Sequence, residues 1–249
     1  MSPIEATLVA LAGVFAGGIN TVVGSGTLIT FPVLLAIGYP PVVANASNSI
    51  GLVPGGIAGA IGYRRELTGQ RPRLIRLGAC SLLGGAIGAL LLLVLSPGVF
   101  KAVVPILIVI ALILVVAQPW LSRKLASMQR QGHGGFSAMA AAFGAGVYGG
   151  YFGAAQGVLL VGLLGILLDE QLQRLNALKN VLTAGVNLIA GVIFVLIADV
   201  AWLVVLLIAI GSTLGGILGA KVGRRLPPAV LRGVIVVVGL VAVVLLVID

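Results

Sequence analysis

The chain has 249 residues, of which 60% are hydrophobic and 8% are charged, and its mean hydropathy is +1.24. A soluble globular domain averages about 25% charged residues, so this composition excludes a water-soluble fold. The net charge of +9 would suggest nucleic acid in a soluble protein. Here the basic residues lie mainly in short loops between apolar segments, where they orient a membrane protein, so the expected partner is a lipid bilayer and not nucleic acid.

Continuous apolar runs, such as LIVIALILVVA at 107–117, predict transmembrane helices. Spanning β-strands would instead alternate apolar and polar residues, and only helices or closed barrels satisfy every backbone amide in hydrocarbon. The predicted fold is therefore an all-α polytopic membrane protein. In chain order, the apolar segments fall at 6–23, 27–37, 45–62, 74–95, 101–119, 136–153, 157–168, 176–198, 200–220 and 229–248.

The extended polar stretch at 120–135 divides these segments into two sets of five. We interpret it as a cytoplasmic linker between a first membrane repeat at 1–119 and a second at 136–249, which together form one transmembrane domain. An offset of 131 residues aligns the two halves without gaps. The aligned pairs include Gly26 and Gly157, Asn45 and Asn176, Ser81 and Ser212, and Pro97 and Pro228. Because Asn, Ser and Pro matches are uncommon in so apolar a chain, they indicate an internal duplication.

Equivalent loops of the two halves differ in their number of Lys and Arg residues, and the richer loop alternates between the halves. The loop at 63–76 has five arginines, whereas its counterpart carries only Asp199. The loop at 96–101 has one lysine, whereas its counterpart at 221–232 has four basic residues. The positive-inside rule then places equivalent loops on opposite sides of the membrane, which predicts inverted repeats, a recurring architecture of secondary transporters. Loops 63–76, 120–133 and 221–232 are predicted to be cytoplasmic, in the cytoplasmic (inner) cell membrane.

The second segment of each half is too short to cross a bilayer. Segment 27–37 covers 11 residues, about 16 Å of helix, against a hydrocarbon core of about 30 Å. Glycines precede each short segment, so we predict that the first two segments of each repeat form a broken or re-entrant hairpin. The predicted hairpin tips comprise Gly24 and Gly26 in the first half and Gly153 and Gly157 in the second. Glycine-rich stretches also allow plain close packing of membrane helices, and that alternative stays open.

Polar side chains gather at these tips and at the starts of the third segments. Free helix N-termini, amides and hydroxyls can all donate hydrogen bonds to an oxyanion, and a lysine adds a cation. The predicted substrate-binding residues are Ser25, Asn45, Asn48, Gln156, Lys179, Asn180 and Asn187. For Lys179 a second interpretation is a side chain that extends from the first turn of its helix to the cytoplasmic interface.

The distribution of ionisable residues narrows the function further. All six acidic residues lie at segment ends, in loops or at a terminus, and the sole histidine, His133, lies in the linker. Cation binding and proton relays in membranes use carboxylates within the spans, so cation transport is disfavoured. Catalytic and metal-binding constellations are not expected either, and neither is any cofactor. Cys80 is the single cysteine, which excludes a disulfide within the chain. These observations favour a neutral or anionic substrate moved by a gradient.

Three motifs resemble the TauE/SafE family, which comprises sulfite exporters and toluene-sulfonate uptake permeases. They are GSGTLITFPVLLAIG at 24–38, VVANASNSIG at 42–51 and YGGYFGAAQG at 148–157. The resemblance implies a duplicated layout and transport of sulfur-containing anions such as sulfite, sulfonates or sulfoacetate, in either direction. It also implies functional roles for Lys179 and Asn187, which match a lysine and a later asparagine of the family. The chain departs from the family at 153–157, where GAAQG stands in place of a frequent Gly-Pro-Gly.

Our hypothesis is a secondary transporter for a small anion, with the hairpin tips and the two Asn-rich segments meeting near the bilayer midplane. Three alternatives stay open. A passive anion channel would share the pore chemistry. A membrane enzyme acting on lipid-linked phosphate would need carboxylates near the tips, which the sequence lacks. A non-transporting partner protein would bind no sulfur oxyanion.

Overall fold

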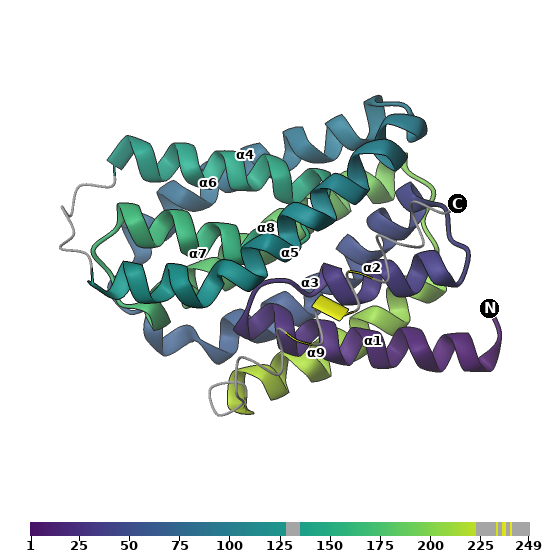
Figure 1. The fold of residues 1–249 in the computed structure, drawn as a ribbon, viewed down its shortest axis with the longest axis horizontal. Coiled ribbons are helices and arrows are strands. Elements are labelled where there is room, and N and C mark those ends of the chain that lie inside the picture. The colour runs from purple at the N-terminus through teal and green to yellow at the C-terminus, as the bar shows by residue number, and fades with distance from the viewer. Residues whose placement is uncertain (128–134, 223–232, 234–235, 238–239, 241–249) are drawn as a thin grey trace.

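The computed structural model describes residues 1–127, 135–222, 233, 236–237 and 240 (Figure 1). All regular elements in these ranges are helical, which confirms the all-α prediction. The α-helices are α1 (Pro3–Val22), α2 (Thr27–Ala36), α3 (Pro41–Gly62), α4 (Arg71–Val94), α5 (Pro97–Ser127), α6 (Gly135–Tyr151), α7 (Gln156–Leu167), α8 (Leu172–Ile197) and α9 (Trp202–Val222), with a short 3₁₀ helix, η1 (Arg64–Leu67). Five stretches of the described residues are long and apolar enough to cross a membrane: α1, α4, Gly98–Ala117 within α5, α8 and α9.

Three boundaries differ from those predicted. α3 and α8 begin at Pro41 and Leu172, about one turn before the predicted starts at 45 and 176. Proline fits the first turn of a helix because N–H groups there have no acceptor within the helix, so the absence of an N–H breaks no hydrogen bond. The asparagine clusters therefore lie inside their helices and not at the helix starts. α5 continues through Ser127, so the first part of the predicted linker at 120–135 is helical. Most of loop 221–232, the rest of the linker with His133, and most of segment 229–248 lie outside the described residues.

Two hairpins approach the middle of the molecule from opposite ends (Figure 1). The N-terminus of α1 and the connection from α2 to α3 lie on the right, whereas α7 lies on the left. α2 has 10 residues and α7 has 12, or about 15 and 18 Å of helix, so neither can cross a hydrocarbon core of about 30 Å. The tips meet, because the Gly157 N–H donates to the Gly24 carbonyl oxygen at 3.0 Å.

The two tips begin in the same way and have the same length. Gly24 and Gly153 adopt left-handed φ angles of +91° and +76°, and their N–H groups close the ends of α1 and α6 on Ile19 O and Tyr148 O at 3.0 and 3.1 Å. This is a usual position for glycine at a helix C-terminus. Gly24 thus corresponds to Gly153, an offset of 129, although the alignment beyond the short helices has an offset of 131. The starts of α2 and α7, Thr27 and Gln156, keep the offset of 129. The expectation of a gap-free alignment is wrong here, because α7 is two residues longer than α2.

The helix packing of the first half recurs in the second. α1 packs on α9 as α6 packs on α4, and α3 packs on α9 as α8 packs on α4. Small residues make these contacts close. A Cβ atom added at Gly17 would lie 2.1 Å from the Ser212 carbonyl oxygen, and one added at Gly146 would lie 2.4 Å from that of Ser81. Such backbone approach is typical of membrane helix interfaces, which cannot rely on the hydrophobic effect.

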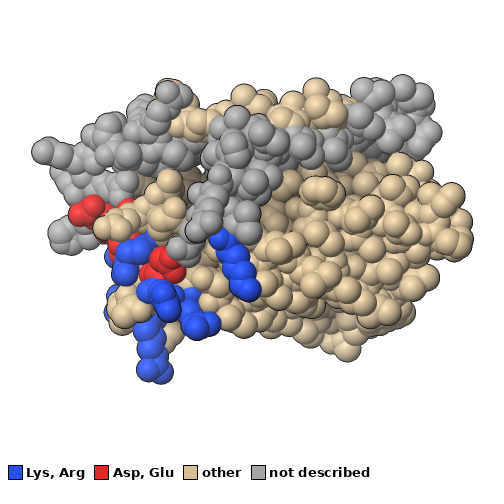
Figure 2. Space-filling view, turned by 90° about the horizontal axis from the view of Figure 1, so that it is seen from below, with Lys and Arg blue, Asp and Glu red and all other residues tan. Residues whose placement is uncertain are grey.

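The Lys and Arg side chains visible in Figure 2 gather toward one end of the molecule, at the left, and the rest of the coloured surface in that view is free of charge. Arg64 and Arg65 line one pocket together with Lys221, the described residue of loop 221–232. Arg73 lines a second pocket together with Gly135, where α6 begins. Described residues of loops 63–76 and 221–232, and the start of α6 that follows loop 120–133, therefore lie at the same end.

Candidate substrate site

Four of the predicted site residues come together where the hairpin tips meet. Ser25 and Gln156, one on each tip, are 1% and 3% exposed, and Lys179 and Asn180 of α8 are 0% and 3% exposed. The aliphatic stem of Lys179 lies against both tips, because a Cβ atom added at Gly24 or Gly157 would be 3.1 or 2.7 Å from Lys179 Cδ. The lysine is therefore packed between the two halves of the protein.

The Lys179 ammonium group lies at the end of α1. Its Nζ donates to the carbonyl oxygens of Asn20 and Thr21 at 2.8 and 3.1 Å. The last carbonyls of a helix carry partial negative charge and have no partner within the helix, so a cation is favourable there. No carboxylate within the described ranges forms an ion pair with it. Because the ammonium group is fully buried, the structure does not support the interpretation that Lys179 extends to the cytoplasmic interface. Its two hydrogen bonds use two of its three N–H donors, so one donor remains.

Three side chains beside Lys179 and the tips have donors without a partner. In the described part of the chain, Ser25 Oγ, Gln156 Nε2 and Asn180 Nδ2 are buried and make no hydrogen bond. Buried polar groups in proteins almost always have a partner, so each exception needs an explanation. Ser25 and Gln156 directly adjoin the touching glycines Gly24 and Gly157, and Asn180 follows Lys179. The Gln156 amide lies against Gly149 of α6. One buried cation and three unpartnered hydrogen-bonding groups therefore belong to the tips and to the part of α8 that packs on them.

Two asparagines hold the broken helices by crossing between the halves. Asn45 Nδ2 donates to the Tyr151 carbonyl oxygen, the last of α6, at 3.0 Å. Its repeat counterpart, Asn176, donates to the Thr21 carbonyl oxygen near the end of α1 at 3.4 Å. Each amide satisfies a carbonyl that the helix itself leaves without a partner. The Asn45 amide nitrogen therefore holds α6, and its Oδ1 has no partner among the described residues.

The remaining two predicted site residues do not join this cluster. Asn48 Nδ2 donates to Thr27 Oγ1 at 3.3 Å, and its Oδ1 accepts from Thr30 Oγ1, so both ends of the amide fasten α3 to α2. Asn187 is half-buried about 10 Å further along α8 than Asn180, and its side chain makes no hydrogen bond within the described residues. Sequence reasoning did not single out Thr30, although a hydroxyl in an otherwise apolar short helix is a visible signal.

The chain matches a model of one protein family along almost its whole length. That family is described as "Sulfite exporter TauE/SafE", and the match covers residues 9–246. The chain belongs to the TauE/SafE family. The membership and the apolar helices together establish a multi-pass membrane protein of a transporter family.

Curated relatives of this TauE/SafE protein have consistent names. "Probable membrane transporter protein YfcA" of Escherichia coli K12 is 27% identical over 242 residues, which cover 97% of this chain and 89% of the relative. "Probable membrane transporter protein" of Haemophilus influenzae is 28% identical over 225 residues, 90% of this chain and 88% of the relative. "Probable membrane transporter protein ORF9" of Sinorhizobium sp. is 24% identical over 239 residues, 96% and 91%. No solved structure matches the chain.

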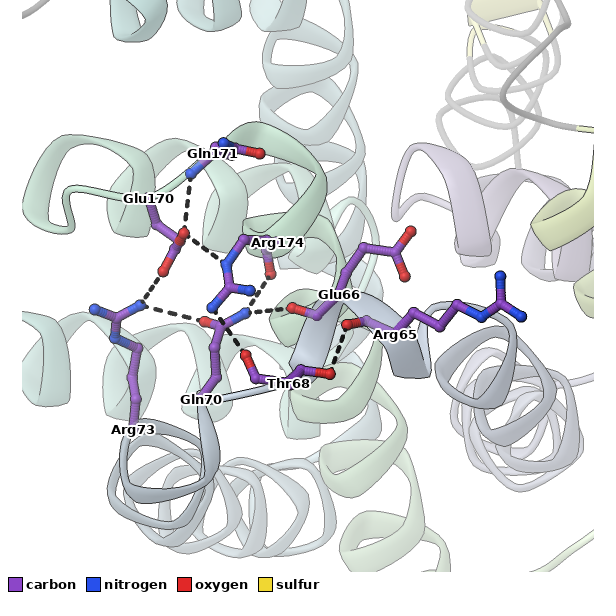
Figure 3. A network of polar contacts seen from close by, with 8 residues as sticks. All are labelled: Arg65, Glu66, Thr68, Gln70, Arg73, Glu170, Gln171 and Arg174. Atoms are coloured by element: carbon purple, nitrogen blue, oxygen red, sulfur yellow. Dashed lines mark hydrogen bonds and ion pairs between the residues drawn. The ribbon is translucent and has the colours of Figure 1, made fainter.

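At its basic end the TauE/SafE protein has a polar network that joins the two halves (Figure 3). Glu170, before α8, accepts from Arg73 of α4 at 2.8 Å and from Arg174 at 2.7 Å. Arg174 also donates to the Thr68 carbonyl oxygen at 3.1 Å. Burial raises the pKa of Glu170, but the hydrogen bonds from Arg73 and Arg174 outweigh it, so this pKa lies below its usual value. The network connects the loop between α3 and α4 to the loop between α7 and α8.

We expect Glu170→Gln to lower the melting temperature in detergent, because it removes a carboxylate that receives two charge-assisted hydrogen bonds, each worth about 1.5–3 kcal/mol. Because the folded-state pKa of Glu170 is depressed, the carboxylate contributes its full stabilisation above the unfolded-state pKa of about 4.3. This stabilisation is lost as the pH falls through the folded-state pKa. The melting temperatures of wild type and Glu170→Gln should therefore differ at pH 7 and converge on acidification. A difference that is unchanged at low pH would contradict this account. Glu5→Gln, at the opposite end, is the control.

Proposed function

We propose that this protein is a secondary transporter that moves a small anion, a sulfur-containing oxyanion or sulfonate such as sulfite or sulfoacetate, across the cytoplasmic membrane. One observation carries the proposal: Lys179 is 0% exposed, and no carboxylate of the described residues pairs with it. The Asn20 and Thr21 carbonyls solvate this ammonium group only in part, and a buried charge without an opposite charge beside it is unfavourable. An anion would supply the missing negative charge, and Ser25 Oγ, Gln156 Nε2 and Asn180 Nδ2 would bind its oxygens.

The arrangement of the hairpins supports transport over simple binding. One tip reaches the site from each end of the molecule, and the Gly157–Gly24 hydrogen bond closes the contact between them. Separation of one hairpin would expose the site to one side only. The recurring packing of α1 on α9 and α6 on α4 supports the inverted duplication, which is the basis of alternating access in many transporters. The positive-inside rule favours a cytoplasmic location for the basic end.

Flux measurements in proteoliposomes test the proposal. Sulfite, sulfoacetate and taurine are compared with uncharged analogues, and uptake is followed with and without unlabelled substrate inside. We expect saturable anion flux and accelerated exchange. Export would be the favoured direction without a coupling ion, because a negative-inside potential drives an anion outward by about 2.3 kcal/mol per charge per 100 mV. Flux that neither saturates nor exchanges would instead indicate a passive channel, and the absence of both flux and binding would contradict transport.

The unpartnered donors give a prediction in which stability and binding change in opposite directions. We expect Ser25→Ala to keep or raise the melting temperature of the ligand-free protein, because a buried unsatisfied group costs about 1–3 kcal/mol. The same change removes a donor to the anion and should raise KM about 5- to 100-fold. Flux kinetics and thermal unfolding measure both effects.

Ser212→Ala is the matched control for this prediction. Ser212 is also fully buried, but its Oγ donates to the Gly51 carbonyl oxygen at 2.9 Å. Its loss should lower the melting temperature and leave KM unchanged. A loss of stability in Ser25→Ala with an unchanged KM would show that Ser25 is structural.

A further inference from the structure

A pocket with basic residues and apolar walls opens at the basic end of the protein, between the last turns of α3 and α9. It encloses about 640 Å³, and its cations are Arg64, Arg65 and Lys221. Ile61 of α3 and Ile217 of α9 form part of its apolar wall and are 54% and 40% exposed. The pocket thus combines positive charge with apolar surface at the place where two helices leave the membrane.

A second groove lies on the other side of α3. It encloses about 410 Å³ between α3 and α8 and is lined by Ile57, Leu67 and Leu188, among other apolar residues. Ile61 and Arg64 line both cavities. The end of α3 is therefore flanked by two apolar grooves, with arginine where they meet.

The three cations of this pocket are exposed. Within the described ranges, Arg64, Arg65 and Lys221 form no ion pair, whereas Arg73 and Arg174 both pair with Glu170. In Figure 3 the Arg65 guanidinium points away from that network, and no dashed line reaches it. Glu66 is the one carboxylate among the residues that line the first pocket, so these residues keep a net charge of +2.

We propose that the end of α3 binds an anionic diacyl phospholipid. Its phosphate lies against Arg64, Arg65 and Lys221, and its two acyl chains occupy the two grooves on either side of Ile61. Basic pockets between membrane helices favour anionic headgroups, and juxtamembrane cations attract anionic lipid by about 1 kcal/mol each. The paired grooves favour a two-chain lipid over a free phosphate or the transported anion, neither of which needs apolar surface. The site is separate from the hairpin tips.

Native mass spectrometry with an equimolar mixture of dioleoyl phosphatidylglycerol and dioleoyl phosphatidylcholine tests this site. We expect wild type to retain phosphatidylglycerol in preference to phosphatidylcholine. In R64Q/K221Q the ratio of the two retained lipids should be about tenfold lower. The matched control is R71Q/R76Q, which also removes two exposed arginines of the basic end but leaves this pocket intact. R65Q alone serves as a second variant should the double substitution prevent folding, with a smaller loss expected.

Two outcomes would overturn the proposal. Equal losses in R64Q/K221Q and R71Q/R76Q would indicate general attraction to a basic surface. Equal protection of wild type against thermal unfolding by water-soluble glycerol phosphate and by phosphatidylglycerol would indicate a phosphate site without a role for the grooves. Ile61→Asn separates these cases, because it keeps every cation and should still weaken lipid retention.

Discussion

Replacing Lys179 with methionine should reduce anion flux by about a hundredfold or more while leaving the protein folded. Methionine keeps much of the apolar stem that lies against Gly24 and Gly157 but removes the ammonium group. Loss of one member of a buried charge pair typically costs 2–5 kcal/mol of binding, and 1.4 kcal/mol is tenfold. Flux in proteoliposomes and substrate-induced thermal shifts measure the effect.

Two further substitutions make the Lys179 result decisive. Arg71→Met removes an exposed cation at the basic end, outside the proposed lipid pocket, and should leave flux unchanged. Lys179→Arg keeps the charge but enlarges a side chain that is 0% exposed, so flux should also fall. Wild-type flux in Lys179→Met would show that the ammonium group only holds the end of α1 through Asn20 and Thr21.

Gly157→Ala should abolish transport by forcing the hairpin tips apart. Its Cβ atom would lie 2.5 Å from Gly24 Cα and 2.7 Å from Lys179 Cδ, closer than real Cβ atoms approach other atoms. Overpacking of this kind typically costs 1–3 kcal/mol, so the melting temperature should fall as well. Gly24→Ala should be worse, because it meets Gly157 at 2.5 Å and also places a side chain at φ +91°.

Two glycines separate the clash from other effects of alanine. Gly144 of α6 has no atom within 4 Å of an added Cβ, so Gly144→Ala should be silent in flux and stability. Gly38 has a φ of +94° and open space around it, so Gly38→Ala isolates the backbone strain from the clash. Flux in Gly157→Ala equal to that in Gly144→Ala would mean that the tips need not meet during transport.

Much of the fold could be predicted because hydrocarbon imposes simple rules on sequence. Long apolar runs, the short segments after the glycines and the basic loops each follow from a single physical constraint, and the helices match them closely. The start of α8 was predicted late because Gln173 and Arg174 make its first turn polar, and that of α3 because Pro40 and Pro41 interrupt the apolar run. The two-residue difference between α2 and α7 was hidden because glycine and alanine match at almost any offset in this chain.

The candidate site was predictable only in part, because residue type shows what a side chain can do but not where it points. Ser25, Gln156, Lys179 and Asn180 lie together because glycines bring both tips against α8. Asn45 and Asn48 have the same chemistry, yet their amides hold Tyr151 and the threonines of α2. Those partners lie on other helices, so no local pattern reveals them.

The exchanged amide contacts of Asn45 and Asn176 mean that neither half of the chain is complete on its own. A solitary half would leave the last carbonyls of its interrupted helix bare in hydrocarbon, where water cannot solvate them. On the proposed duplication, the ancestral gene product would have met this need by pairing two identical subunits in antiparallel orientation. Fusion of the two copies then linked the subunits covalently, so that their pairing no longer depended on association within the bilayer.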